Sequence, residues 1–233
     1  MNVESRPSPN QDDRPAGVVV DMLVLHYTGM RTAEEALARL THAASKVSAH
    51  YTIARDGQVY AHVPEGRCAW HAGLSFWSGR PGVNARSIGI ELINPGHEFG
   101  YVPFAEPQIQ VLMALAKEIC VRHAIPRANV VGHSDVAPMR KTDPGELFPW
   151  QRLAGEGIGL WPGMGGTRET RVNLLSNPAA GLARFGYGLP PHSDHRLDHV
   201  VAAFQRHFRP TKVDFRWDDE CAERLASLLG QLP

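Results

Sequence analysis

The sequence predicts an α/β protein whose sheet is at least partly antiparallel. Two apolar runs of strand character, residues 22–26 and 129–133, each end in a histidine. Residues 48–63 have the pattern of a hairpin, which requires antiparallel strands. Residues 106–123 have apolar side chains at the spacing of a long amphipathic helix. A glycine-dense segment then separates these elements from short predicted helices at the C-terminal end.

Composition describes a soluble globular protein. The 233 residues, 43% hydrophobic and 21% charged, suffice for a sizeable core. The formal net charge is zero, so nothing in the charge balance points to nucleic acid or to an anionic membrane. Cys68, Cys120 and Cys221 are far apart and show no Cys-x-x-Cys spacing, which argues against a disulfide framework and against a thiolate zinc site.

The N-terminal segment gives an expectation about location. Residues 1–17 are polar and rich in Pro, Asp and Arg, without the basic and apolar regions of an export signal. No window reaches the length of a transmembrane helix. We therefore expect a cytoplasmic protein, and the periplasm is the alternative if an export signal has been removed.

The first part of the chain has the pattern of a strand, a helix and a hairpin. Residues 18–26 form a largely buried strand, and Thr32 is placed to cap the helix that follows it. A strand over residues 48–54 then leads through an Arg-Asp-Gly-Gln turn into a second strand over residues 59–63.

The middle of the chain combines a long loop with a buried strand. Residues 64–86 lack periodicity but contain Trp70 and Trp77, and long unpatterned loops in compact domains are usually functional or disordered. The two tryptophans argue against disorder. Residues 87–92 form an apolar strand with a single carboxylate, Glu91, and burying a carboxylate is costly unless it is paired or functional.

The C-terminal part is predicted to be a separate small domain. A short helix and a turn over residues 148–161 complete the larger domain, and the glycine-dense segment 162–167 is the expected linker. We place the larger domain at residues 1–165 and the tail at residues 166–233. Three short helices are expected in the tail, over residues 174–185, 195–208 and 218–229.

A polar turn over residues 139–145 places Lys141 two residues before Asp143 and ends in Pro-Gly. His26 and His133 both end predicted strands, where side chains from separate segments converge. Two histidines and one carboxylate are a recurring ligand set of catalytic zinc, which leaves a fourth position for water or substrate. The alternative is a pair of hydrogen-bonded core histidines and an unrelated surface turn.

Other residues compete for the same roles. His50 and His71 are rival imidazole ligands, and Asp135 is a rival carboxylate. Cys68 near His71 offers a thiol nucleophile, but its sequence context resembles no known activating environment.

Two residues near the expected ligands have side chains suited to acid–base and oxyanion chemistry. Glu91 is the candidate general base, because burial tends to raise the pKa of a carboxyl group into a useful range. Its alternative role is a strand-edge carboxylate bonded to backbone amides. Lys141 can lie on the same side of the turn as Asp143 and stabilise an oxyanion, an effect worth roughly 3 kcal/mol. Its alternative is a solvated surface lysine.

Six motifs occur in order along the chain. They are Leu-His-Tyr-Thr at residues 25–28, Val-Ser-Ala-His-Tyr at 47–51, Ala-Trp-His-Ala-Gly at 69–73, Ser-Ile-Gly-Ile-Glu-Leu at 87–92, Gly-His-Ser-Asp-Val-Ala-Pro at 132–138 and Arg-Lys-Thr-Asp-Pro-Gly at 140–145. Together they resemble the zinc-dependent N-acetylmuramoyl-L-alanine amidases of the AmpD/AmiD type, which are related to peptidoglycan recognition proteins. The resemblance covers residues 14–161.

This resemblance implies a mixed central β-sheet flanked by helices, with Zn²⁺ on His26, His133 and Asp143 and catalysis by Glu91 and Lys141. It also implies the reaction, which is hydrolysis of the amide bond between N-acetylmuramic acid, including its 1,6-anhydro form, and L-alanine of peptidoglycan stem peptides, in cell-wall recycling or turnover. The substrate contacts that it suggests are Trp70, His71, Asn84, Arg80 and Lys46.

The tail carries a second resemblance. Residues 173–229 resemble the small three-helix peptidoglycan-binding domain through Arg-Phe-Gly-Tyr at 184–187 and Ala-Phe-Gln-Arg-His-Phe-Arg-Pro at 203–210. The tail then either binds glycan or braces the catalytic domain, and the expected partner is a muropeptide or peptidoglycan substrate. The alternative function is a non-catalytic peptidoglycan-recognition module. Such relatives typically lack a metal ligand, whereas all three candidate ligands are present here.

Overall fold

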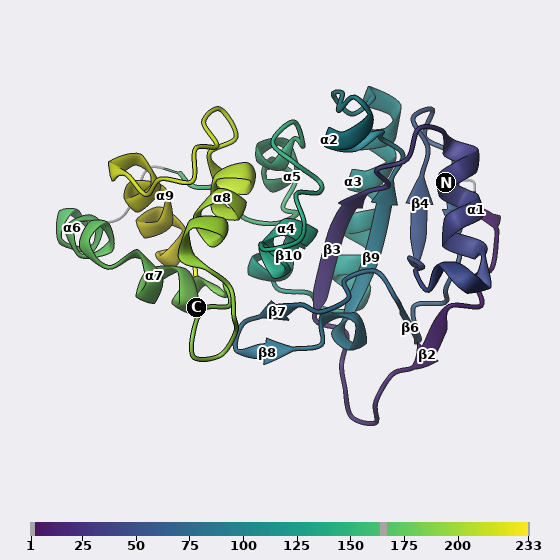
Figure 1. Cartoon of the computed structure of the whole chain (residues 1–233), viewed down its shortest axis with the longest axis horizontal. Coiled ribbons are helices and arrows are strands. Elements are labelled where there is room, and N and C mark those ends of the chain that lie inside the picture. The colour runs from purple at the N-terminus through teal and green to yellow at the C-terminus, as the bar shows by residue number, and fades with distance from the viewer. Residues whose placement is uncertain (1–2, 164–166, 233) are drawn as a thin grey trace.

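A six-stranded mixed β-sheet forms the centre of the molecule (Figure 1). This computed structural model describes residues 3–163 and 167–232. In spatial order the strands are β1 (Val3–Ser5), β5 (Val59–Ala61), β4 (Tyr51–Ile53), β9 (Ser87–Leu92), β3 (Met22–Tyr27) and β10 (Val130–Gly132). The β4–β5 hairpin is antiparallel and the other neighbours are parallel, which confirms the predicted mixed sheet.

The two faces of the sheet carry different side chains because residues alternate along a strand. Leu23 and Leu25 of β3 belong to one apolar cluster, together with side chains of α3. Met22 and Val24 point the other way and join a second cluster with apolar residues of the C-terminal helices. His26 continues the alternation of Met22 and Val24, so its imidazole lies on the face opposite α3.

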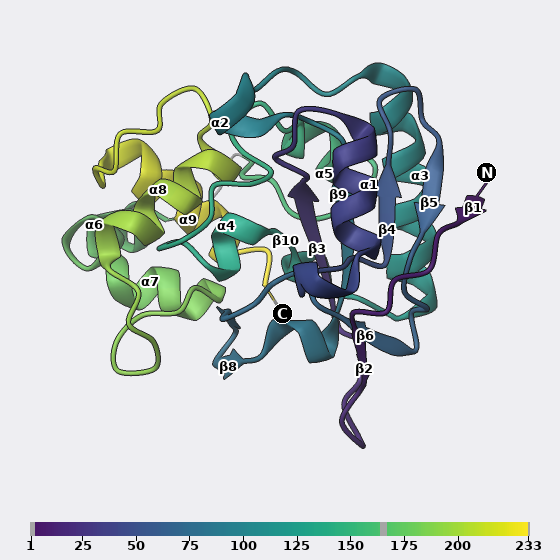
Figure 2. The same cartoon turned by 45° about the vertical axis from the view of Figure 1, so that its right-hand side comes forward.

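Helices cover both faces of the sheet. In Figure 2, α1 lies in front of β3, β4 and β9, whereas α3 lies behind the strands. Thr32 caps α1 as predicted, since its side chain accepts a hydrogen bond from the Glu35 backbone N–H. The helices of this part of the chain are α1 (Ala33–Thr41), α2 (Gly96–Phe99), α3 (Glu106–Arg122), α4 (His133–Val136) and α5 (Trp150–Gly155), with 3-10 turns at Ala43–Ser45, Val83–Arg86 and Arg127–Asn129.

Two segments that lack a strand pattern nevertheless contain short strands. In the polar N-terminal segment, β1 pairs with β5, and β2 (Gln11–Asp13) pairs with β6 (Arg67–Ala69). The long loop also holds a ribbon of β7 (Phe76–Trp77) and β8 (Arg80–Pro81). Strands this short show no usable alternation, so the sequence does not reveal them. The Arg14 guanidinium joins the two segments by donating hydrogen bonds to the backbone carbonyls of Glu65, Asn84, Ala85 and Ser87.

The described part of the tail has four helices, so the prediction of three was wrong. The expected helix over residues 174–185 is interrupted because Pro178 has no N–H and begins a new helix, which Asn177 caps through the Ala180 N–H. The four helices are α6 (Arg168–Ser176), α7 (Pro178–Phe185), α8 (Leu197–Phe208) and α9 (Asp219–Leu229). The predicted linker includes residues 164–166, which lie outside the described residues together with the expected boundary at residue 165.

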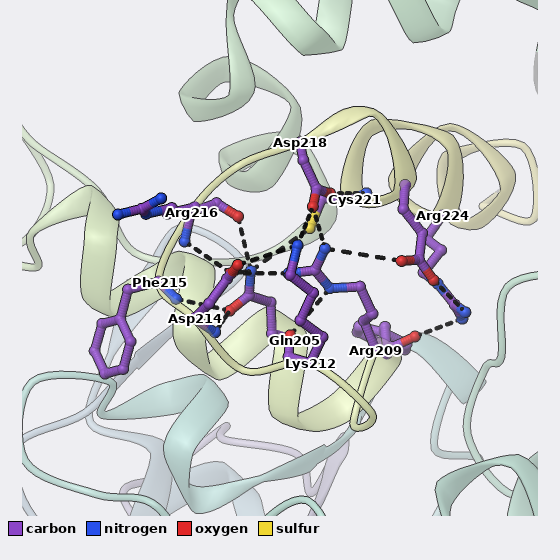
Figure 3. Close-up of polar contacts among 11 residues, drawn as sticks. Gln205, Arg209, Lys212, Asp214, Phe215, Arg216, Asp218, Cys221 and Arg224 are labelled. Carbon is purple, nitrogen blue, oxygen red and sulfur yellow. Dashed lines mark hydrogen bonds and ion pairs between the residues drawn. The ribbon is translucent and has the colours of Figure 1, made fainter.

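The tail shares its hydrophobic core with the sheet. Phe185 and Phe204 of the tail belong to the same buried cluster as Met22 and Trp77, and the Trp77 and Phe185 rings lie 6.0 Å apart. Figure 3 shows how polar side chains that include Gln205 fasten the loop between α8 and α9. Within residues 3–163 and 167–232, no helical segment combines the length and the hydrophobicity of a membrane crossing.

Candidate active site

The three predicted ligands converge on one buried point. His26 Nδ1, His133 Nδ1 and Asp143 Oδ2 lie 3.0 Å from one another, and all three residues are buried. Zinc bonds of about 2.0–2.1 Å at tetrahedral angles hold ligand atoms roughly 3.3 Å apart. The spacing and the nitrogen and oxygen donors therefore fit a divalent transition metal, and His26, His133 and Asp143 are candidate ligands that the described chain brings together.

Strand pairing explains how two of these residues meet the candidate base. In the parallel register of β3 and β9, His26 lies directly opposite Glu91. In the parallel register of β3 and β10, Gly132 lies opposite Leu25. The residues that follow them, His133 and His26, therefore lie at the same level of the sheet. The carboxyl ends of three neighbouring strands thus bring two imidazoles and one carboxylate to the same edge of the sheet.

The turn that supplies Asp143 is fixed by hydrogen bonds from other segments. The Ser134 N–H donates to the backbone carbonyl of Asp143 over 2.9 Å. The Tyr101 hydroxyl donates to the carbonyl of Pro144 over 2.5 Å. Gly145 has φ +83°, and a Cβ there would lie 2.5 Å from the Tyr101 hydroxyl, so both the conformation and the space require glycine.

A chain of hydrogen bonds sets the tautomer of His26. The Ser87 hydroxyl donates to the Val83 carbonyl over 2.7 Å and accepts from His71 Nε2 over 3.0 Å. His71 Nδ1 is then an acceptor for His26 Nε2–H, at 3.0 Å. His26 is left with a lone pair on Nδ1, which faces the other two ligands. His133 has the same tautomer, since its Nε2 donates to the Ala72 carbonyl over 3.2 Å.

His26 and Asp143 have the protonation states that metal binding requires. Burial and, to a smaller extent, the neighbouring His133 lower the pKa of His26 to about 4 against the opposing effect of Asp143. Burial alone would raise the pKa of Asp143, but the contacts of its carboxylate with the His133 and His26 imidazoles outweigh burial and hold that pKa below its usual range. Near neutral pH the site therefore offers a neutral imidazole at His26 and a carboxylate at Asp143.

Glu91 has the environment of a functional carboxyl group. Its Oε2 atom is buried and has no hydrogen-bond partner in the described part of the chain. Burial raises the pKa of Glu91 well above its usual value, the negative charge of Asp143 adds to this shift, and the positive charge of Lys141 opposes it. The alternative of a carboxylate bonded to backbone amides does not hold for this oxygen.

A single cavity of about 780 Å³ contains the candidate catalytic groups. Glu91, Lys141 and the ligands His133 and Asp143 line it, as does Trp70 of the aromatic loop. Its other side is formed by α1 and by the loops that follow β3 and β9. The volume suits a ligand of several sugar or amino-acid units.

The other predicted substrate contacts have varied positions. Lys46 Nζ lies 6.0 Å from the centre of the Trp70 ring, outside the residues that line the cavity. Arg80 pairs with Asp21 at 2.7 Å and is exposed. The Asn84 side-chain oxygen accepts the backbone N–H groups of His71 and Ala72, so Asn84 shapes the loop behind the cavity wall.

The rival ligands have other partners. His50 Nδ1 accepts the Gly89 N–H over 2.9 Å, and the His71 ring stands behind His26. Asp135 accepts the Gly132 N–H over 2.7 Å. Cys68 is buried, and burial raises the pKa of its thiol, which disfavours the thiolate that a nucleophile needs. Sequence reasoning missed Ser87, because a serine at the start of an apolar strand has no distinguishing pattern.

Comparison with known proteins agrees with this geometry. The family model for N-acetylmuramoyl-L-alanine amidases, Amidase_2, matches residues 15–146. AmiD of Escherichia coli is 41% identical over 91% of this chain and 84% of its own length. The chain belongs to this amidase family. It is an N-acetylmuramoyl-L-alanine amidase, and the match to the family model includes the three candidate metal ligands together with Glu91 and Lys141.

Other members of the amidase family resemble the chain in sequence and in structure. AmpD of Citrobacter freundii, a 1,6-anhydro-N-acetylmuramyl-L-alanine amidase, is 35% identical over 63% of this chain and 86% of its own length. The E. coli AmiD structure has a TM-score of 0.79 at 37% identity, covering 93% of this chain and 92% of that one. AmpDh3 of Pseudomonas aeruginosa also has a TM-score of 0.79, at 35% identity, covering 93% of this chain and 94% of that one.

Proposed function

We propose that this amidase uses Zn²⁺, held by His26, His133 and Asp143, to hydrolyse the bond between N-acetylmuramic acid and L-alanine of muropeptides, including their 1,6-anhydro forms, in cell-wall recycling or turnover. The observation that carries the proposal is the convergence of three ligand atoms, at 3.0 Å spacing, beside the unpartnered carboxyl oxygen of Glu91. Related proteins support the substrate class, since AmiD was solved with anhydro-N-acetylmuramic acid-L-Ala-D-γ-Glu-L-Lys and AmpDh3 with an anhydromuramic pentapeptide.

The chain's own residues supply the proton transfers. Bound zinc would act as a Lewis acid toward the scissile carbonyl and the attacking water. Glu91 removes a proton from that water, for which its raised pKa suits it. The same carboxyl group then gives the proton to the nitrogen of L-alanine as the C–N bond breaks. Lys141 lies in the same cavity, where its positive charge stabilises the oxyanion of the tetrahedral intermediate.

The predicted substrate contacts differ in whether they line the cavity. Trp70 presents its ring to the cavity and is held by a hydrogen bond from Nε1–H to Asp12 Oδ2 at 2.7 Å. A flat aromatic wall suits the apolar face of a sugar ring. Lys46 Nζ lies 6.0 Å from the centre of this ring but outside the residues that line the cavity, so we assign Lys46 no direct contact. We assign direct contact to Trp70 and His71, which line the cavity, and indirect roles to Asn84 and Arg80.

Replacing the base tests the mechanism. Glu91→Gln preserves shape but removes the proton acceptor, so kcat on an anhydromuropeptide should fall by about 10²–10⁴-fold while zinc stays bound. Release of free L-Ala peptide is measured by mass spectrometry, and zinc by elemental analysis. Glu118→Gln, an exposed change on α3 behind the sheet, is the control and should leave kcat unchanged. A Glu91→Gln variant with normal turnover would refute the assignment of the base.

A comparison of substrates tests the place of the enzyme in the cell. Faster turnover of soluble anhydromuropeptides than of whole sacculi is the expected result for recycling in the cytoplasm, whereas strong activity on sacculi indicates turnover in the envelope. The alternative function, a module that binds muropeptides without cutting them, predicts binding with no free L-Ala peptide. That outcome with zinc-loaded protein would contradict the proposal.

A further inference from the structure

The turn that carries His133 is attached to the tail through one buried carboxylate. Asp135 is 1% exposed. Its Oδ2 accepts hydrogen bonds from the Gly132 N–H and from His207 Nδ1, each at 2.7 Å. Its Oδ1 accepts the hydroxyl of Tyr187, also at 2.7 Å. Two of its three donors therefore come from the C-terminal tail.

The same turn holds two of the three metal ligands. His133 is the first residue of α4, directly after Gly132, whose N–H is bonded to Asp135. The next residue, Ser134, donates its N–H to the backbone carbonyl of Asp143 over 2.9 Å. Any rotation of α4 thus moves His133 directly and Asp143 through its main chain.

The two tail donors are themselves fixed by packing. The Tyr187 ring is 2% exposed and lies 5.0 Å from the ring of Trp77. The His207 ring is 3% exposed and stacks on Trp150 at 3.7 Å. Neither donor is replaced by water without opening the core. A carboxylate that loses such a donor stays buried with an unmet hydrogen bond, which costs about 1–3 kcal/mol or more for a charged group.

We propose that Tyr187 and His207 are positioning residues for the metal site, acting through Asp135 on the α4 turn. The inference rests on the zinc site of the proposed function. It assigns the tail a role in metal affinity that is separate from substrate contact. The described residues that line the cavity all precede Glu146, so the tail does not touch a substrate there. Changes at these two positions should therefore alter zinc binding and leave KM of the zinc-saturated enzyme unchanged.

Three variants of the full chain separate positioning from simple bracing. Tyr187→Phe removes one oxygen atom. His207→Leu and His207→Asn both lose the imidazole stack, but only asparagine retains an N–H donor near the position of Nδ1. Trp217→Phe is the control, because Trp217 donates to the Leu174 carbonyl at 3.0 Å and belongs to the same tail core.

Zinc affinity is measured by competition with a chromophoric chelator, and the absorption spectrum of the cobalt-substituted protein reports ligand geometry. Tyr187→Phe should raise the zinc Kd by roughly 10-fold. His207→Leu should raise it at least as much, and His207→Asn should recover part of the loss. Trp217→Phe should lower Tm without changing the Kd or the cobalt spectrum.

The outcomes distinguish two kinds of failure. If wild-type protein binds zinc and the Tyr187 and His207 variants bind it equally well, losing only thermal stability as Trp217→Phe does, the positioning role is overturned. If wild-type protein binds no zinc, the proposed metal site itself is wrong, and the positioning role is refuted with it. If His207→Leu does not fold, Tyr187→Phe still decides the question.

Discussion

Two polar clusters among the described residues differ in how their charges are compensated. In the tail cluster, the Arg209 guanidinium is fully buried and lies 3.0 Å from Asp214, within hydrogen-bonding contact of Asp218 and 3.8 Å from Glu220 (Figure 3). In the metal-site cluster, three ligand atoms face one another and the Glu91 Oε2 atom has no partner in the described chain. In the first cluster each carboxylate lies near a cation, whereas in the second the Glu91 Oε2 atom has no partner among the described residues.

The tail cluster shows what a purely structural network achieves. Gln205 Oε1 accepts the N–H groups of Asp214 and Phe215, which holds Phe215 at φ 64°. Burial raises the pKa of Asp218, but hydrogen bonds from the Cys221 N–H and from Arg209 outweigh it and bring that pKa to about 2. A network in which each polar group has a hydrogen-bond partner stabilises a loop. A buried polar group without a partner instead suggests a site that binds a ligand.

The largest effect is expected from breaking the metal-site cluster. Asp143→Ala removes the carboxylate ligand, so zinc affinity should fall by more than the roughly 10–100-fold that follows loss of an outer partner of a ligand. Activity should fall below detection at stoichiometric zinc, as measured by elemental analysis and by peptide release. Asp194→Ala, an exposed change in the tail, is the control and should retain both. Full activity in the Asp143 variant would mean that this residue is no ligand.

Breaking the tail cluster should affect stability and leave the site unchanged. Arg209→Ala removes the buried cation that Asp214 and Asp218 share and leaves only the exposed Lys212 beside them, so it should lower the free energy of unfolding by about 3 kcal/mol. Urea denaturation followed by tryptophan fluorescence measures the change. The exposed Arg216→Ala serves as the comparison and should cost little. If folded Arg209→Ala protein loses zinc or kcat, the two clusters are not independent.

A smaller effect is expected from a single methyl group behind His26. A Cβ on Gly89 would lie 2.5–2.7 Å from the His71 ring, which cannot move without breaking its bond to His26. Gly89→Ala should therefore cost about 2 kcal/mol of stability through overpacking and should also weaken zinc binding. In Gly66→Ala the added Cβ meets nothing within 4 Å, so this variant should resemble wild type in both measurements. Equal zinc affinity in the Gly89 variant would show that the hydrogen-bond chain does not orient His26.

The smallest effect concerns the stability cost of Glu91. Its folded-state pKa is raised, so protonated Glu91 contributes stability below its unfolded pKa of about 4.3, and this contribution is lost as pH rises toward the folded pKa. Metal-free Glu91→Gln should thus be more stable than metal-free wild type by about 1 kcal/mol at pH 7, and the difference should shrink as pH falls to 4. Urea midpoints at several pH values test this, and a pH-independent difference would contradict it.

The sequence predicted the site because its residues occupy positions that local patterns expose. His26 and His133 each end an apolar strand, which predicted that the two imidazoles converge, and Glu91 is the one carboxylate in an apolar strand. The Lys-Thr-Asp-Pro-Gly turn was recognisable from its residue types. The motif order added the roles of Glu91 and Lys141, which the pattern left open between catalytic and structural alternatives.

What the sequence did not reveal depends on contacts between distant segments. The hydrogen bonds of Asp135 to Tyr187 and His207 join residues that are far apart in the sequence and share no local pattern. Strand β1 has only three residues and shows no alternation of apolar and polar side chains. The prediction of one helix over residues 174–185 failed for a different reason. The apolar spacing continues across Pro178, but a proline has no N–H to donate and therefore ends the hydrogen bonding of the preceding helix. Ser87 contacts His26 only through His71, by two successive hydrogen bonds, and no local sequence pattern indicates this link.

The pairing of His26 with Glu91 across β3 and β9 limits where the chain tolerates insertions. One added residue inside either strand would turn the side chains that follow it to the opposite face and separate the Glu91 carboxyl group from His26. The loops that follow these strands are not part of this register. A change in their length would alter the shape of the cavity and leave His26 opposite Glu91.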